Sequence, residues 1–499
     1  MRILLDTNIL ILREDNKIIP QEIQTLLKIL EKIKAEILIH PMSVRELEKD
    51  KKENRREIIL SKIKLYQQLE SPPEFLEDKI FRSKITEGNE HEKIDNNILY
   101  AVYKDAVDFL ITEDKGIHKK GSNIGIKERV LLIDDALQMF EKTTTVSKPV
   151  FPPALKEIEV CNLNRSDPIF DKLKQNYPEF SEWISRISRE GRKCWVNYKT
   201  DKSIGALLIY KIEDEPIEGT PPLPKKKRFK ISTFVVGNVG QKIGELFIKL
   251  SIDYCVKNDL TEIYLTHFQE PDDRLEQLIT EYGFKKVSVS KRGENIFLKR
   301  LLATPSEIKG YSPIQILKEF YPSFYDGSQV KKYVIPIRSD YFDQLFTDYT
   351  PRQIEIKESS DKFIVEGNTI KKAYLTHSKI TKLQQGDILL FYRSKRGSEI
   401  TSIGVVESIH TRLTNPDEII KIVGKRTVYS VDGIRKIARK PTTVILFYHV
   451  FHLPNPITYQ NLKEMGVLSG PPQSICEVGD KGYQKIIRRS GIDEHFTIH

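Results

Sequence analysis

The sequence predicts a multidomain protein that combines α/β and α+β domains, and three observations support this class. Strand-like and helix-like segments alternate over the first part of the chain, which is typical of a parallel sheet covered by helices. The middle part mixes consecutive strands with amphipathic helices, which predicts a mixed sheet. The last part consists mostly of short strands at close spacing, which favours a small β-barrel.

The composition is that of an ordinary globular protein. At about 100–200 residues per domain, the 499 residues predict about three domains, and 39% hydrophobic with 30% charged residues makes extensive disorder improbable. A net charge of +10 favours polyanionic partners, but only weakly over this length. The four cysteines show no C-x-x-C spacing, so they indicate neither a zinc site nor a disulfide framework. We found no signal peptide and no apolar run of the ~18 residues that span a membrane, so we expect a soluble, cytoplasmic protein.

Two seams divide the chain. Residues 141–153 contain three threonines and three prolines without periodicity, which is typical of a linker. Proline and glycine residues also recur over residues 302–332, around one short helical stretch. The predicted domains therefore cover residues 1–142, 155–303 and 331–499.

Hydrophobic periodicity locates the elements of each predicted domain in turn. In the first domain we expect strands at 1–5, 35–40, 107–112 and 130–134, and helices at 20–34, 43–69 and 91–105. In the second we expect helices at 167–191, 244–259 and 271–283, and strands at 193–199, 203–212, 228–237, 262–268, 284–290 and 295–300. In the third we expect strands at 332–337, 387–394, 402–410 and 442–451, and a helix at 458–465.

Acidic residues of the first domain recur where ligands bind in parallel sheets, outside the carboxyl ends of the strands. Asp6 and Asp114 follow strands directly, Glu46 lies just after another strand, and Asp95 opens a helix. Carboxylates brought together repel strongly and are seldom tolerated without a cation. Magnesium and manganese prefer such oxygen ligands, and a pair of them is a standard device for phosphodiester hydrolysis. The pattern therefore predicts a metal site.

Each of these acidic residues also has a structural interpretation. Ser43 and Glu46 have the spacing of a helix capping box. Asp6 is suited to cap the turn after the first strand, and Asp95 to favour a helix N-terminus. Any one residue fits the structural interpretation better, and only the joint pattern favours a site.

Four segments in order, "LLDTNIL", "PMSVRELE", "IDNNILYAV" and "DFLITEDKGI", resemble the PIN nuclease domain. The resemblance implies a parallel α/β/α sandwich and a Mg²⁺- or Mn²⁺-dependent endonuclease that acts on single-stranded RNA. It places metal-binding acids at Asp6, Glu46, Asp95 and Asp114, with Asn8 and Thr112 as accompanying catalytic-site residues. The implied reaction uses metal-activated water, so no side-chain nucleophile is needed.

The second predicted domain places a glycine-containing turn between a long strand and a helix, over residues 237–244. Glycines allow close backbone approach to a phosphate, and a helix N-terminus supplies free N–H groups. A plain turn in which glycines adopt positive φ explains the same residues.

This domain resembles the GNAT acyltransferases in "GALLIYKI", "EIYLTHF" and "EYGFKKV" around that turn. The resemblance implies acetyl-CoA binding, and we place the cofactor-binding residues at Val236, Gly240, Gln241, Lys242, Gly244 and Glu245. The glycine motif is degenerate, because Val239 stands for its leading Arg or Gln and Lys242 for its middle glycine.

The catalytic residues of the second predicted domain are less well marked. Ile279 occupies the position where the family often has a tyrosine acid, and Tyr282 is the nearby tyrosine. His267, at the end of "IYLTH", is a candidate base with a suitable ordinary pKa, although a histidine at a strand end is more often simply hydrogen-bonded.

The third predicted domain resembles the PUA-like barrels of the EVE or ASCH kind, through "YVIPIRSDYFDQLF", "GDILLFYRS" and "ITSIGVVES". The resemblance implies a pocket for RNA or a modified base. Interleaved basic and aromatic residues suit phosphates and stacked bases, although such aromatics equally fill barrel cores. The candidate contacts are Lys371, Lys372, Tyr374, Tyr392 and Arg393.

The leading functional hypothesis is a metal-dependent endoribonuclease joined to an acetyl-CoA-binding domain and an RNA-binding domain. One alternative is an N-acetyltransferase acting on RNA, protein or a small amine, with the nuclease-like domain used for binding. Another is a non-enzymatic RNA-binding regulator that senses acetyl-CoA. The expected partners are single-stranded RNA and acetyl-CoA, with an inhibitory or partner protein as a further option.

Overall fold

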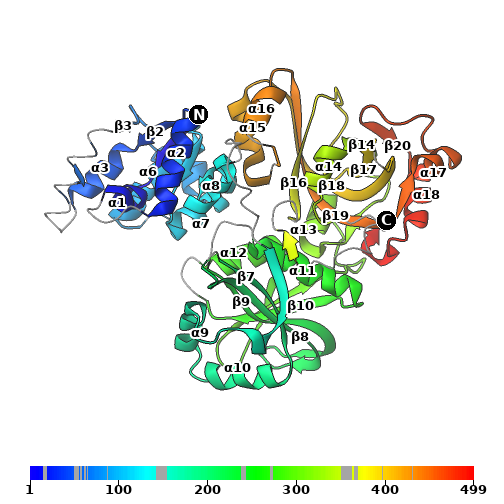
Figure 1. Cartoon of the computed structure of the whole chain (residues 1–499), viewed down its shortest axis with the longest axis horizontal. Coiled ribbons are helices and arrows are strands. Elements are labelled where there is room, and N and C mark those ends of the chain that lie inside the picture. Colours follow the sequence, from blue (N-terminus) through cyan, green and yellow to red (C-terminus); the bar gives the residue numbers. More distant parts are fainter. Residues whose placement is uncertain are drawn as a thin grey trace.

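Three sheets, one after another along the chain, organise the molecule (Figure 1). The computed structural model describes residues 1–14, 20–49, 56, 59–60, 63, 66–86, 88–141, 154–199, 201–237, 243–269, 273–349, 362–364, 369–395, 397–426, 428–429 and 431–499. Among these residues, no helix is both long enough and apolar enough to cross a bilayer.

The first sheet is parallel and five-stranded, in the order β3-β2-β1-β4-β5. Successive residues of its central strand are buried on opposite faces. Ile3 and Leu5 pack in one apolar core and Leu4 in another, as a strand covered on both sides requires. The strands are β1 (Arg2–Leu5), β2 (Glu36–Ile39), β3 (Gln67–Gln68), β4 (Phe109–Ile111) and β5 (Val130–Leu131).

Helices cover both faces of this sheet (Figure 1). They are α1 (Thr7–Glu14), α2 (Gln21–Lys32), α3 (Pro41–Glu48), α5 (Lys79–Arg82), α6 (Glu90–Tyr103), α7 (Lys115–Asn123) and α8 (Ile133–Glu141), with a 3₁₀ turn η1 (Lys127–Arg129). The helix expected at 43–69 is found in part: α3 begins at Pro41 and ends at Glu48, the described residues 56, 59, 60 and 63 are also helical, and β3 lies where the end of the helix was expected.

The second sheet has eight strands in the order β11-β12-β10-β9-β8-β7-β6-β15. Its β10–β9 pair is parallel and the other pairs are antiparallel, so the predicted mixed sheet is confirmed. The strands are β6 (Ala154–Glu159), β7 (Lys193–Tyr198), β8 (Ile204–Ile217), β9 (Leu223–Val236), β10 (Glu262–His267), β11 (Lys285–Val289), β12 (Asn295–Arg300) and β15 (Lys362–Ile364). The helices are η2 (Val160–Asn162), η3 (Pro168–Phe170), α9 (Asp171–Asn176), α10 (Phe180–Arg189), α11 (Ile243–Lys257) and α12 (Arg274–Glu281).

The third sheet has six strands in the order β16-β19-β18-β17-β14-β20. The predicted closed barrel is not confirmed, because β16 and β20 are the sheet's two edges in the described part of the chain. The strands are β14 (Lys332–Arg338), β16 (Lys371–Thr376), β17 (Ile388–Ser394), β18 (Glu399–Leu413), β19 (Thr442–Thr458) and β20 (Cys476–Val478). Around them lie α14 (Ser339–Leu345), α15 (Pro416–Val423), η4 (Gly424–Arg426), α16 (Val431–Ile437), α17 (Tyr459–Glu464), α18 (Asp480–Ser490) and η5 (Glu494–Phe496).

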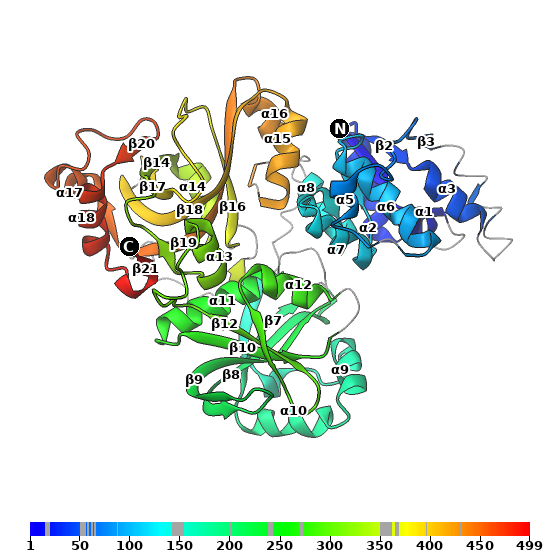
Figure 2. The same ribbon diagram turned by 180° about the vertical axis from the view of Figure 1, so that it is seen from behind.

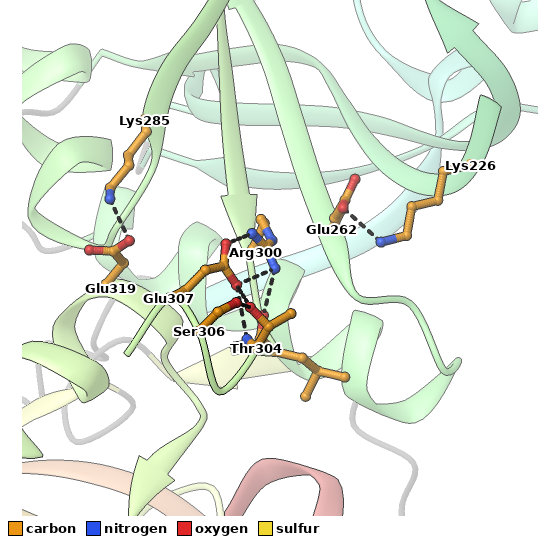
Figure 3. A network of polar contacts seen from close by, with 9 residues as sticks. Lys226, Glu262, Lys285, Arg300, Thr304, Ser306, Glu307 and Glu319 are labelled. Carbon is orange, nitrogen blue, oxygen red and sulfur yellow. Dashed lines mark hydrogen bonds and ion pairs between the residues drawn. The ribbon is translucent and has the colours of Figure 1, made fainter. Parts of the chain in front are cut away.

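The second expected seam is a packed connection between the second and third sheets. It contains α13 (Pro313–Phe320) and β13 (Phe324–Tyr325), which pairs with β21 (Thr497–Ile498). Arg300 forms an ion pair with Glu307 at its start, and Glu307 also accepts hydrogen bonds from Thr304 (Figure 3). Ion pairs Lys285–Glu319 and Lys226–Glu262 lie in the same region (Figure 3).

The three parts share apolar cores, so they do not pack as independent domains. Helices α15 and α16, which extend from the third sheet, contact the first part of the chain (Figures 1 and 2). Ile419 and Ile420 lie in one core with Ile3 and Leu5. Another core joins residues of the second sheet, such as Phe229, to residues of the third, such as Val405.

Candidate functional site

The register of the parallel sheet brings two of the predicted acidic positions to one edge. Leu5 lies opposite Ile111 on the adjacent strand. Asp6 and Thr112, one residue further along each strand, are therefore neighbours, and the Asp6 N–H donates to the Ile111 carbonyl over 3.1 Å. Asp114 follows two residues later and caps α7 by accepting from the Ile117 N–H over 3.0 Å.

The Asp6 carboxylate is buried, with 4% of the residue exposed, and three donors hold it. The Thr112 hydroxyl donates to its Oδ2 over 2.6 Å and the Asn8 amide over 2.8 Å, while the Thr7 N–H donates to Oδ1 over 2.7 Å. Asn8 also donates to the Thr112 hydroxyl over 3.1 Å. Asn8 and Thr112 therefore hold the Asp6 carboxylate in place. Both side chains lie beside Asp6, where the sequence analysis expects them. Asp6 also stands directly before α1, and its side chain accepts from the first N–H of that helix, at Thr7.

The structural interpretations of Glu46 and Asp95 do not hold. His40 caps α3, accepting from the Met42 N–H over 3.1 Å, so Ser43 lies inside the helix and forms no capping box. Asn89 caps α6, which places Asp95 beyond its first turn. Glu46 instead pairs with His91 Nδ1 over 3.0 Å.

The electrostatics indicate that the four carboxylates, which we call the acid cluster (Asp6, Glu46, Asp95 and Asp114), act on one another. Burial raises the pKa of Asp6 to about 6, and the nearby Asp114 and Glu46 carboxylates add to the rise. Burial likewise raises the pKa of Asp95 to about 7, with further increases from Asp114 and Asp6. The buried Lys120 opposes this shift. Carboxylates from α3, α6 and two strand ends are thus close enough to influence one another electrostatically.

The donor set of the acid cluster fits a hydrated hard cation. In the described part of the chain, its carboxylates do not form a group of three whose ligand atoms all lie within 4.8 Å of one another. Magnesium is typically held through one or two carboxylates and keeps several waters, so wider spacing suits it. A divalent cation would also offset the repulsion that adds to the burial-driven rise of these two pKa values.

A large cavity of about 1450 Å³ opens beside the second sheet. Parallel strands β9 and β10 pair only as far as Ile231 and Leu265, and both continue beyond that point, to Val236 and His267. Over the described residues the two strands therefore diverge at their carboxyl ends, and both strands line the cavity there. Lys115 and His118 of α7 line the same cavity, so it reaches the helix that Asp114 caps.

The predicted cofactor residues fall only partly within this cavity. Val236, Gly244 and Glu245 line it, while Gly240, Gln241 and Lys242 lie outside the described residues. The Glu245 carboxylate accepts from the backbone N–H groups of Ile370 and Lys371 over 2.9 and 3.1 Å, so this side chain ties α11 to the third sheet. The cofactor assignment stays a prediction.

The two catalytic candidates of the second domain are engaged differently. His267 lines the cavity, and its Nε2 lies 2.5 Å from Asp273 Oδ2, which positions it as an imidazole–carboxylate pair. Tyr282 is buried, and burial together with Glu245 raises its pKa well above the ordinary value. A phenol held this way is a poor proton donor to a departing thiolate.

The predicted RNA-contact residues require a correction, because the structure places most of them inside the protein. Lys371 is 7% exposed and pairs with Glu281, while Lys372 is 1% exposed and donates to the Leu345 carbonyl. Tyr392 is 2% exposed and belongs to the core. The remaining two are also engaged, since Tyr374 donates to the Pro336 carbonyl over 3.0 Å and Arg393 pairs with Asp343 over 2.8 Å.

Two functional candidates near the acid cluster were missed by the sequence analysis. Lys120, a buried cation on α7, acts on the Asp95 carboxyl, and His91 contacts Glu46. A sequence signal exists only for Lys120, which lies three residues after the buried Ile117 on the inner face of α7. Nothing in the sequence distinguishes His91 from a solvated helix residue.

Comparisons with known proteins give fold likenesses to parts of the chain. A scan of protein-family models finds no match, and a search of curated proteins finds none either. An ASCH protein from Zymomonas mobilis is 15% identical, covering 32% of this chain and 94% of its own, with a TM-score of 0.25. A GNAT-family acetyltransferase from Staphylococcus aureus is 16% identical, covering 30% and 99%, with a TM-score of 0.22.

A third similar structure is the NatC complex bound to Gag peptide and CoA, at 13% identity, 29% and 95% coverage and a TM-score of 0.21. None of the structures named here is described as a nuclease. Likenesses at these identities and TM-scores carry no argument about function, so any assignment depends on the geometry of this chain.

Proposed function

We propose that the N-terminal part of the chain is a divalent-metal-dependent nuclease whose site is the acid cluster. The observation that carries the proposal is the gathering of carboxylates from four separate elements: burial first, and then the neighbouring carboxylates, raise the pKa of Asp6 to about 6 and that of Asp95 to about 7. Helix capping does not explain Asp95, which caps no helix and is half-buried near the other three carboxylates.

Within this proposal each side chain has a distinct role. Asp6, Glu46, Asp95 and Asp114 hold Mg²⁺ or Mn²⁺. The metal, when bound, supplies activation of water and neutralises charge that develops on the phosphate. Thr112 and Asn8 orient Asp6 by donating hydrogen bonds to Oδ2, and the Thr112 hydrogen bond opposes the rise in the Asp6 pKa. Single-stranded RNA is the proposed substrate class, on the sequence resemblance to the PIN domain.

The test is cleavage of labelled single-stranded RNA with Mn²⁺ by the full chain and by matched variants. Glu46→Gln and Asp6→Asn should lose more than about 100-fold of the rate, since even outer-shell partners of a metal are worth 10–100-fold. Glu48→Gln, an exposed position on the same helix as Glu46, should retain activity. Equal rates for Glu46→Gln and Glu48→Gln, or no metal-dependent cleavage by the natural sequence, would contradict the proposal.

A second activity has its own supporting observation, the cavity between the parting ends of β9 and β10. We propose that it binds acetyl-CoA, with the pantetheine arm along β9 and the phosphates near the start of α11. His267, paired with Asp273, is then the proposed base for transfer to an amine. The acceptor is an RNA, protein or small amine, and the nuclease-like domain in this alternative serves binding.

Thermal unfolding with and without acetyl-CoA tests the second proposal. At 100 times Kd a ligand stabilises the native state by about 2.7 kcal/mol, and we expect this response to disappear in Gly244→Asp. A Cβ at Gly244 would lie 2.6 Å from a terminal methyl of Leu278, which can move aside. Gly470→Asp is the matched control, because open space surrounds Gly470. Unchanged thermal stabilisation by acetyl-CoA in a folded Gly244→Asp protein would contradict the proposed acetyl-CoA site.

A further inference from the structure

A second group of ligand-type side chains lies away from the acid cluster, between the second and third sheets. Asp348 follows α14, and His449 and His452 belong to β19. One ligand atom from each lies within 4.8 Å of the others, and this is the one such group of three in the described residues. None of the three lines the large cavity.

A β-bulge aligns the two histidines. Residues three apart on a regular strand point to opposite faces. Here Ile403 of β18 pairs with Phe451 and Gly404 pairs with His449, so Val450 is the extra residue. The bulge turns His449 and His452 to the same face, and bulges often re-aim side chains at functional sites.

Polar atoms of this group are buried without hydrogen-bond partners. Both ring nitrogens of His449 have none, and Nε2 of His452 and Oδ1 of Asp348 form no hydrogen bond, although these last two atoms lie 3.1 Å apart. His449 is 2% exposed, so water does not reach it freely. Leaving such groups unpaired is costly, and their convergence on one point suits a ligand shared by the three side chains.

A protonated histidine does not explain the arrangement. Nε2 of His452 and Oδ1 of Asp348 lie 3.1 Å apart, which suits an ion pair. His449, however, remains unsatisfied at both nitrogens in either protonation state, because a neutral imidazole needs one acceptor and one donor.

The groups around these side chains hold them in place for a ligand. The Ser402 hydroxyl lies 2.8 Å from Nδ1 of His452, which leaves Nε2 of that ring facing Asp348. Lys249 of α11 pairs with the other carboxylate oxygen of Asp348, and the Tyr321 hydroxyl donates to the His449 carbonyl over 2.8 Å. Such outer partners typically orient metal ligands.

We propose that Asp348, His449 and His452 bind one divalent transition-metal ion of the zinc or ferrous type. Two imidazole nitrogens and one carboxylate oxygen match the borderline preference of these ions, whereas magnesium prefers oxygen alone. Ligand atoms at about 2.1 Å from one ion stand roughly 3–3.5 Å apart, close to the 3.1 Å between His452 and Asp348. The ion joins the third sheet to the segment after α14, next to Lys249 of the second part.

The test is the zinc content of the full-length protein after equilibration with Zn²⁺ and removal of free metal, measured by mass spectrometry. The natural sequence should hold about one zinc per chain at this site. His449→Phe and Asp348→Asn should each lose it, while Asp6→Asn should retain it because the acid cluster is separate. His410→Gln, a histidine of β18 outside the group, is the matched control.

Folding is checked on the same proteins. His449→Phe keeps an aromatic ring beside Phe346, whose ring centroid lies 5.1 Å from that of His449. It should melt at or above the metal-free natural protein and show no melting-temperature rise with zinc, while the natural protein responds. Should His449→Phe not fold, Asp348→Asn decides by the same zinc content and melting response. Zinc retained by either folded variant, or absent from the natural protein, would overturn the proposal.

Discussion

At the scale of single residues, Asp95 is the carboxyl most out of place without a cation. It belongs to the second turn of α6, caps nothing, and has a pKa raised to about 7 by burial and neighbouring carboxylates. A folded-state pKa above the unfolded value means that the native state binds more protons. The contribution of Asp95 to the stability of the native state is therefore greatest below about pH 4 and falls as the pH rises toward 7.

Asp95→Asn should consequently stabilise the metal-free protein at pH 8 by about 1–3 kcal/mol, because the amide carries no charge to desolvate. The gain should shrink toward pH 4, where the native carboxyl is already protonated. Chemical denaturation with chelator present, at both pH values, measures this. A destabilised variant at pH 8 would contradict the account of the acid cluster.

The sequence predicts the acid cluster as a site, and the structure brings Asp6 and Asp114 to one edge because strand ends of a parallel sheet meet there, while helices α3 and α6 supply Glu46 and Asp95. Sequence analysis failed for Lys371 and Lys372, whose lysine character predicts exposure. Tertiary contacts with Glu281 and the Leu345 carbonyl bury them instead. The Asp348 group was invisible for another reason, since the spacing of His449 and His452 puts them on one face only through a bulge.

At the scale of elements, periodicity located most of the long strands and the helices α2, α6, α11 and α12, but not β16, α8 or α18. It missed α15 and α16, which are short helices between two long strands and which bury their apolar residues against another part of the chain. The predicted strands of the third part were right in type, but local pattern does not decide whether a sheet closes, because closure depends on how its edge strands meet.

The docking of α15 on the first part of the chain is testable. Ile420 is 1% exposed in a core that includes Ile3 and Leu5. Ile420→Ala should lower the free energy of unfolding by about 2–4 kcal/mol, through lost burial and the cavity left behind. Glu418→Ala, at an exposed position of the same helix, should change it by less than about 0.5 kcal/mol. Equal effects of the two substitutions, measured by urea unfolding, would show that α15 does not pack there.

At the scale of the whole molecule, Glu281 of α12 joins all three parts. Its carboxylate pairs with Lys127 of the first part and with Lys371 of the third. Although burial opposes ionisation, these two lysines lower the Glu281 pKa to about 2. Arrangements of this kind, between residues more than 80 positions apart, depend on the assembled fold and are not readable from local sequence.

Glu281→Gln should therefore weaken the assembly at neutral pH. A folded-state pKa below the unfolded value gives stability that is present above about pH 4.5 and is lost as pH falls toward 2. The substitution should destabilise the protein by about 1–4 kcal/mol at pH 7, and the difference from the natural sequence should narrow below about pH 4. Thermal unfolding across this range is the measurement, and a pH-independent difference would contradict the ion-pair account.

The central claim is that the acid cluster holds a divalent cation, and crystals grown with Mn²⁺ test it most directly through an anomalous difference map. The account predicts a peak among Asp6, Glu46, Asp95 and Asp114, about 2.0–2.2 Å from at least one carboxylate oxygen, and no such peak in Asp6→Asn crystals. An ordered natural-sequence site without a peak, or one whose peak survives unchanged in Asp6→Asn, would contradict it.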